Sequence, residues 1–146
     1  SMAELVRQYY ALEADVVRKT GCDIIGHFDL ITKFCDVCPQ IIDTCSQDYT
    51  SARDHALSAL IKTGKIFEVN TGAMARGYRR LPYPDASCLR AIAERGGKVM
   101  ITSDCHKKEQ LCYGFETAKE FLVSNGFKCV YLYNNGRFES TSIENI

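Results

Sequence analysis

Three side chains at the ends of two apolar runs have the right chemistry for metal ions: His27 after the first run, and Asp104 and His106 after the second. Residues two apart on an extended chain point to the same face, so the Asp104 carboxylate and the His106 imidazole can bind one ion. Cys105, between them, is expected to point to the opposite face. His27, Asp104 and His106 are therefore candidate metal ligands, and Asp104 and His106 are also candidate catalytic residues. The alternatives are a packed core histidine at 27 and a helix-capping turn at 103–106.

Two more polar side chains, Glu68 and Asn70, lie near the end of another apolar run. A buried carboxylate needs a partner, which makes Glu68 hard to explain as a simple core residue. Asn70 could instead hold the loop that follows it. In parallel α/β architectures, functional groups gather at the carboxyl ends of the strands, so these residues are expected at the same rim as His27 and Asp104.

A loop over 71–84 carries three arginines, Arg76, Arg79 and Arg80, among glycines and prolines. A guanidinium group binds phosphate oxygens in a bidentate manner, so these arginines are candidate phosphate-binding residues. The alternative is a solvated basic loop. No glycine-rich motif of the Walker or dinucleotide type is present.

The elements that must position these residues alternate between strand and helix patterns, which is typical of an α/β fold with a parallel sheet and covering helices. Region 30–48 is expected to be an active-site loop with a short turn of helix. The pattern predicts helices over 3–19, 49–63, 85–95 and 115–125, strands over 23–28, 65–70, 98–103 and 128–133, and a short hairpin strand over 137–139.

Composition indicates an ordinary globular domain of 146 residues, with 46% hydrophobic and 25% charged residues. Eighteen basic residues balance eighteen acidic ones, which disfavours nucleic acid or an anionic membrane as the main partner. No apolar run approaches the ~20 residues of a membrane span, and no signal-peptide pattern is visible. We therefore expect a cytoplasmic protein.

Eight cysteines invite a disulfide or zinc interpretation, but the long helix and strand patterns favour reduced thiols. Cys22, Cys88 and Cys129 are expected to be small core residues. A thiol redox module built on Cys35 and Cys38 is a remote alternative, because no long helix directly follows that pair.

Together these residues resemble the histidinol-phosphatase branch of the PHP (polymerase and histidinol phosphatase) superfamily. The resemblance runs from Asp23 to about Thr141 and rests on four segments, 23–31, 67–72, 76–84 and 101–106. It implies a distorted barrel with zinc, iron or manganese ions at its carboxyl rim. It also implies hydrolysis of phosphate monoesters, in this branch L-histidinol phosphate during histidine biosynthesis. His27, Asp104 and His106 resemble family metal ligands, and Arg76 or a neighbour resembles a phosphate contact.

The family's opening His-x-His strand and its middle Glu and His motifs are absent. Since a full (β/α) barrel needs ~250 residues, we expect 1–146 to form one domain, a half TIM-like PHP barrel without its N-terminal half. It should have about four parallel strands with covering helices and end in a short hairpin. Such a half barrel exposes sheet edges and apolar surface, which favours a homodimer or another assembly. Two functions stay open: a metal-dependent phosphoesterase that needs its missing half, and a catalytically dead structural or binding module with a relic metal site.

Overall fold

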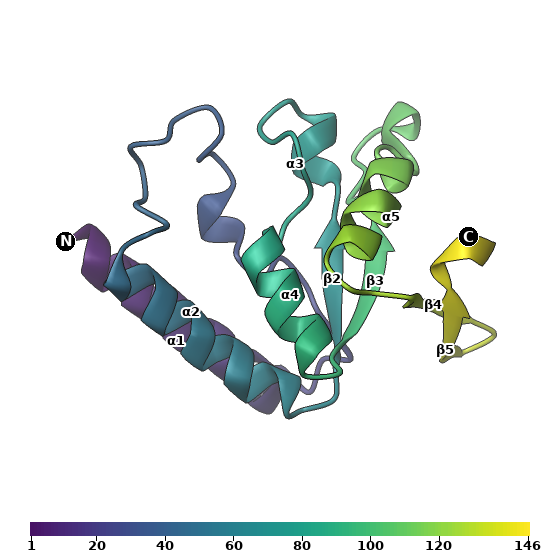
Figure 1. Ribbon diagram of the computed structural model, residues 1–146, viewed down its shortest axis with the longest axis horizontal. Coiled ribbons are helices and arrows are strands. Elements are labelled where there is room, and N and C mark those ends of the chain that lie inside the picture. The colour runs from purple at the N-terminus through teal and green to yellow at the C-terminus, as the bar shows by residue number, and fades with distance from the viewer.

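The computed structural model describes residues 1–146 and shows a mixed α/β chain (Figure 1). Its helices are α1 (Met2–Thr20), α2 (Gln47–Ile61), α3 (Gly72–Ala75), α4 (Ala86–Glu94) and α5 (Phe115–Ser124). Its strands are β1 (Ile24–Ile25), β2 (Ile66–Asn70), β3 (Lys98–Thr102), β4 (Cys129–Asn134) and β5 (Arg137–Ser142). Three short 3-10 helices complete it: η1 (Leu30–Thr32), η2 (Lys108–Gln110) and η3 (Ile143–Asn145).

The main sheet has three parallel strands in the order β1-β2-β3, so β2 is central. Ile24 pairs with Ile66, and Phe67 pairs with Val99. Helices α1 and α2 pack side by side, α2 also contacts α4, and α5 contacts β3 (Figure 1). The carboxyl ends of β2 and β3 therefore lie at the same edge, next to α3.

The expectation of about four parallel strands is wrong. The fourth strand, β4, pairs antiparallel with β5 in a separate two-stranded sheet, and the sheets do not close into a barrel. The turn at Asn135 and Gly136, both with positive φ, folds the chain back so that β4 finds its hydrogen-bond partner locally. A short apolar run does not reveal by itself whether its partner is parallel or antiparallel, which explains the error.

Local signals explain most element boundaries. Ser46 caps α2 by accepting a hydrogen bond from the Tyr49 amide, and Asp85 caps α4 in the same way. The first strand is shorter than predicted because the chain turns at His27, whose φ is 56°. Helix α3, inside the predicted arginine loop, was not predicted; at four residues it is too short to show a helical period.

The core lies between the sheet and the helices and is built from apolar side chains of both. Its fully buried members include Leu57, Leu60, Phe67, Ile92 and Leu122.

All eight cysteines are free thiols, as predicted. Cys88 is buried as expected and Cys22 is half-buried, whereas Cys129 is exposed, contrary to its predicted place in the core. The cause is the position of β4 in the outer hairpin rather than in the parallel sheet. None of the helices combines the length and the apolar character needed to cross a membrane.

Candidate functional site

Three predicted rim residues meet at the carboxyl edge of the sheet. His27 follows β1, Glu68 lies in β2 and Asp104 follows β3. The His27 ring bridges the other two: its Nδ1 lies 3.5 Å from Glu68 Oε2, and its Nε2 lies 3.5 Å from Asp104 Oδ2. Parallel strands deliver their following residues to one edge, which is why residues so far apart in sequence come together.

The backbone at this edge turns sharply. His27 and Asp104 have φ values of 56° and 44°, in the left-handed region that few residues other than glycine adopt. Glu68 holds one of these turns, because its Oε2 accepts a hydrogen bond of 2.8 Å from the His27 amide. Its Oε1 accepts another of 2.6 Å from the Thr102 hydroxyl, so the buried carboxylate is well partnered.

Arg76 contacts both predicted ligands that follow β3, Asp104 and His106. Its Nη2 donates a hydrogen bond of 3.0 Å to Asp104 Oδ2, and its Nη1 lies 3.2 Å from His106 Nδ1. The same His106 nitrogen lies 2.8 Å from the Asp104 carbonyl oxygen. Burial raises the pKa of Asp104, but hydrogen bonds and charge from Arg76 and His27 outweigh burial and hold the pKa below its usual range. Asp104 is therefore ionised at neutral pH.

His27, Arg76, Asp104 and His106 line an open cavity of about 380 Å³. Lys33 also lines the cavity, and nothing in the sequence pointed to it, because a lone lysine in an irregular loop carries no signal. The Lys33 ammonium lies 5.3 Å from the ring centroids of both Phe34 and Tyr78. The full lining is His27, Leu30, Lys33, Arg76, Tyr78, Tyr83, Asp104 and His106.

The remaining predicted site residues lie elsewhere. Arg79 donates a hydrogen bond of 2.8 Å to the Thr32 hydroxyl, and Arg80 has a side chain that is 93% exposed; neither lines the cavity. Asn70 accepts a hydrogen bond of 2.8 Å from the Gly72 amide, so it holds the loop after β2, the second of its two predicted roles. Of the three loop arginines, Arg76 alone is placed to meet a ligand in this cavity.

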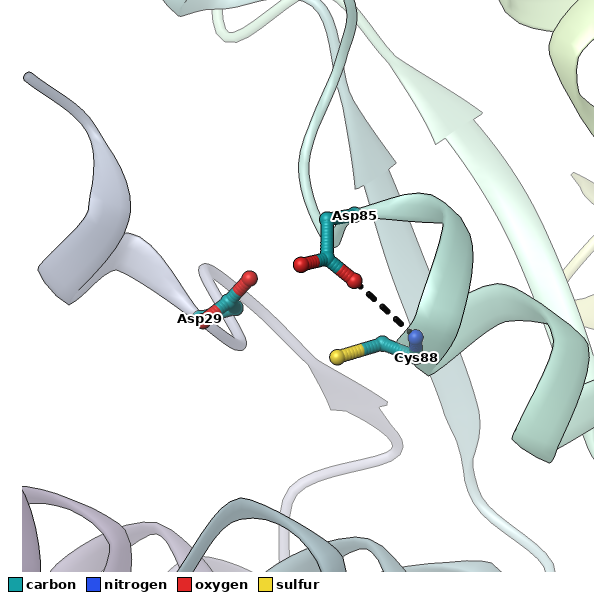
Figure 2. Close-up of side chains that lie close together, drawn as sticks. All are labelled: Asp29, Asp85 and Cys88. Carbon is teal, nitrogen blue, oxygen red and sulfur yellow. Dashed lines mark hydrogen bonds between the residues drawn. The ribbon is translucent and has the colours of Figure 1, made fainter. Parts of the chain in front are cut away.

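The rim donors fit a metal ion only in part. His27 and Asp104 point toward each other, but His106 Nδ1 faces the Asp104 carbonyl oxygen and Arg76, so the three do not form a compact ligand set. A compact set exists deeper in the chain, where ligand atoms of Asp29, Asp85 and Cys88 all lie within 4.8 Å of one another (Figure 2). This buried cluster is compatible with a metal site. No sequence motif signals it, because its members are spread over 60 positions.

Two curated proteins, each named probable histidinol-phosphatase, are similar to this chain. One, from Schizosaccharomyces pombe, is 25% identical over 133 residues, which cover 91% of this chain and 43% of that protein. The other, from Deinococcus radiodurans, is 31% identical over 126 residues, which cover 86% of this chain and 45% of that protein. The chain thus spans less than half the length of these relatives. No protein-family model matches it. The similarities support a relationship to histidinol-phosphatase-like proteins.

Proposed function

We propose that this chain supplies the phosphate-binding side of a metal-dependent phosphoesterase whose substrate is L-histidinol phosphate. The observation that carries the proposal is the placement of Arg76 against Asp104 and His27 in one cavity at the carboxyl edge of the sheet. The two similar proteins named probable histidinol-phosphatase support the same reaction class. The half PHP barrel remains part of this proposal, with three parallel strands in place of four.

The charges of the cavity suit a phosphate monoester. Arg76 offers a planar set of N–H donors, and Lys33 places a second cation on the wall formed by the region after η1. A phosphate group bound between them would lie near the rings of His27 and His106, which line the same space. Glu68 and Asp104 hold His27 from both sides and so keep its ring directed into the cavity.

The metal part of the proposal rests on His27 and Asp104. Their facing atoms, Nε2 and Oδ2, lie 3.5 Å apart, and donors outside this chain would complete the coordination together with His106. A bound metal ion would polarise the phosphoryl group and lower the pKa of a water molecule. This chain's own part is to hold the ligands, orient His27 through Glu68 and bind the phosphate through Arg76.

Isothermal titration of the chain with inorganic phosphate, L-histidinol phosphate and L-histidinol tests the binding step. The two phosphate compounds should bind and L-histidinol should not. Arg76→Met should weaken phosphate binding about tenfold or more, since charge-assisted hydrogen bonds contribute roughly 1.5–3 kcal/mol. Arg80→Met is the matched control, because that side chain is exposed outside the cavity. Equal affinities of the two variants would contradict the assignment.

A second candidate is a binding module without turnover. One observation favours it: His106 does not join His27 and Asp104 in a compact metal site. Phosphate release from L-histidinol phosphate with added Mn²⁺ or Zn²⁺ separates the two candidates. Turnover that disappears in His27→Ala supports the enzyme, whereas phosphate binding without turnover supports the module.

The expected homodimer or other assembly also stays a proposal. Its support is that β1 and β3 are the edges of the parallel sheet, and that Leu132 and Tyr133 on β4 are 40% and 63% exposed. Sedimentation at micromolar concentration tests it, and a monomeric mass would count against it.

A further inference from the structure

We infer that Asp29, Asp85 and Cys88 form a buried site for one divalent cation of the zinc type, separate from the rim cavity. Asp29 comes from the turn before η1, Asp85 is the N-cap of α4, and Cys88 lies in the first turn of that helix. One ligand atom from each lies within 4.8 Å of the other two. Figure 2 shows the Cys88 sulfur and a carboxylate oxygen of Asp85 directed toward Asp29 across a common space.

One buried oxygen of this cluster, Asp29 Oδ2, lacks a hydrogen-bond partner, and a bound ion would supply one. Asp29 is fully buried, and its Oδ1 accepts hydrogen bonds of 2.5 Å from Tyr10 and 2.7 Å from Tyr49. Its Oδ2 is also buried and has no hydrogen-bond partner. Buried polar atoms without partners are rare, because leaving such an atom without a hydrogen bond costs folding free energy. A bound cation or a proton would remove this cost at Asp29 Oδ2.

Hydrogen bonds from neighbouring groups fix the carboxylates of Asp29 and Asp85, as hydrogen bonds to the ligands do in metal sites. Asp85 Oδ1 accepts hydrogen bonds from the Ser87 amide, the Ser87 hydroxyl and the Cys88 amide, at 2.9, 2.6 and 3.0 Å. All three use Oδ1, which leaves Oδ2 free for an ion. The hydroxyls of Tyr10 and Tyr49 orient Asp29 in the same manner.

The donor set selects the class of ion. Two carboxylates and a thiol suit Zn²⁺ or Co²⁺, whereas Mg²⁺ and Ca²⁺ prefer oxygen ligands alone. Three protein ligands leave one position of a tetrahedral ion for water. The thiol must ionise on binding: the S–H bond breaks, the sulfur lone pair binds the metal, and the proton leaves to the buffer.

The rival occupant of the same space is a proton. A protonated Asp29 could donate from Oδ2 to Asp85 and satisfy the unpaired oxygen without any metal. Direct metal binding distinguishes the two, because only an ion requires the Cys88 sulfur.

The test adds Co²⁺ alone, and then Zn²⁺ as competitor, to the full chain carrying His27→Ala and His106→Ala, which weaken binding at the rim. We expect one equivalent of Co²⁺ with the near-ultraviolet absorption of a thiolate–cobalt bond. Cys88→Ser should abolish this absorption and weaken Zn²⁺ binding more than about 100-fold, since changes in outer contacts alone cost 10–100-fold. Cys129→Ser is the control, because that thiol is exposed.

Asp29→Asn is the second variant in case Cys88→Ser does not fold, as judged by circular dichroism. Asparagine tolerates the left-handed backbone at 29, where φ is 69°, and it keeps an acceptor for the two tyrosines. It should lower Co²⁺ affinity while the thiol remains. Absence of the absorption, or its persistence in Cys88→Ser or undiminished in Asp29→Asn, would overturn the inference. Co²⁺ binding at this cluster and phosphate binding at the rim cavity are measured separately, so a negative result for one does not decide the other.

Discussion

The guanidinium of Arg76 and the carboxylate of Asp104 lie 3.0 Å apart, and both side chains lie so close to Gly72 that a Cβ atom there would overlap them. Arg76 follows the short helix α3 and Asp104 follows β3, so their contact joins two different connections of the sheet. Gly72, the first residue of α3, faces both side chains. The geometry of the candidate phosphate site therefore depends on the absence of a side chain at position 72.

Gly72→Ala should weaken phosphate binding about tenfold, or about 1.4 kcal/mol, while the chain still folds. The added Cβ would lie 2.8 Å from Arg76 Nη2 and 3.0 Å from Asp104 Cβ, so Arg76 must move and the pair must open. Isothermal titration with phosphate measures the effect. Gly26→Ala is the control, because its added Cβ would meet Glu68 Oε2 at an ordinary 3.5 Å. Unchanged phosphate affinity in Gly72→Ala would show that the Arg76–Asp104 contact does not matter for binding.

Asp29→Asn should flatten the pH dependence of stability in the metal-free protein. Burial and the charge of Asp85 raise the pKa of Asp29 to about 6, although hydrogen bonds from Tyr10 and Tyr49 lower it. The unfolded carboxyl has a pKa of about 4, so the folded state binds the proton more tightly. Its contribution is complete below about pH 4 and is lost as pH rises through about 6.

Asparagine cannot ionise. Between about pH 4 and about pH 7, the unfolding free energy of the variant should therefore rise by roughly 1–3 kcal/mol relative to that of the natural sequence. Urea unfolding at both pH values, with a chelator present, measures this difference. A parallel shift of both proteins with pH would show that Asp29 does not titrate in this range.

Asp85→Ala should destabilise the chain by about 1 kcal/mol, the typical cost of losing a helix N-cap. The Asp85 carboxylate accepts hydrogen bonds from the amides of Ser87 and Cys88, which have no partner inside α4. Asp85→Asn keeps an acceptor at this position and should recover most of the loss. Urea unfolding with a chelator present compares the three proteins, and equal loss in both variants would mean that charge rather than capping matters here.

Leu60→Ala should cost roughly 2–5 kcal/mol of unfolding free energy, because it opens a cavity in the core. Leu60 is fully buried near the end of α2, whereas Leu12 on α1 is 65% exposed. Leu12→Ala is therefore the matched control and should change stability by less than about 0.5 kcal/mol. A similar loss in both variants, measured by urea unfolding, would contradict the placement of the core.

The sequence alone was enough to predict four helices and the parallel strands β2 and β3 close to their observed places. Helical periodicity, the caps at Ser46 and Asp85, and apolar runs all act between residues that are near neighbours along the chain. The same local pattern placed His27, Glu68 and Asp104 at strand ends, and parallel strands bring such ends together whatever the details of packing.

Only the tertiary structure decided which partners these elements and side chains meet. The sequence predicted the closing hairpin, but not that its first strand, β4, stays outside the parallel sheet. Nor did it show that Arg76, rather than Arg79 or Arg80, lines the cavity. The clustering of Asp29 with Asp85 and Cys88 is likewise a product of packing. The position of Arg76 and the Asp29–Asp85–Cys88 cluster depend on how segments far apart in sequence approach one another, and local spacing does not determine that approach.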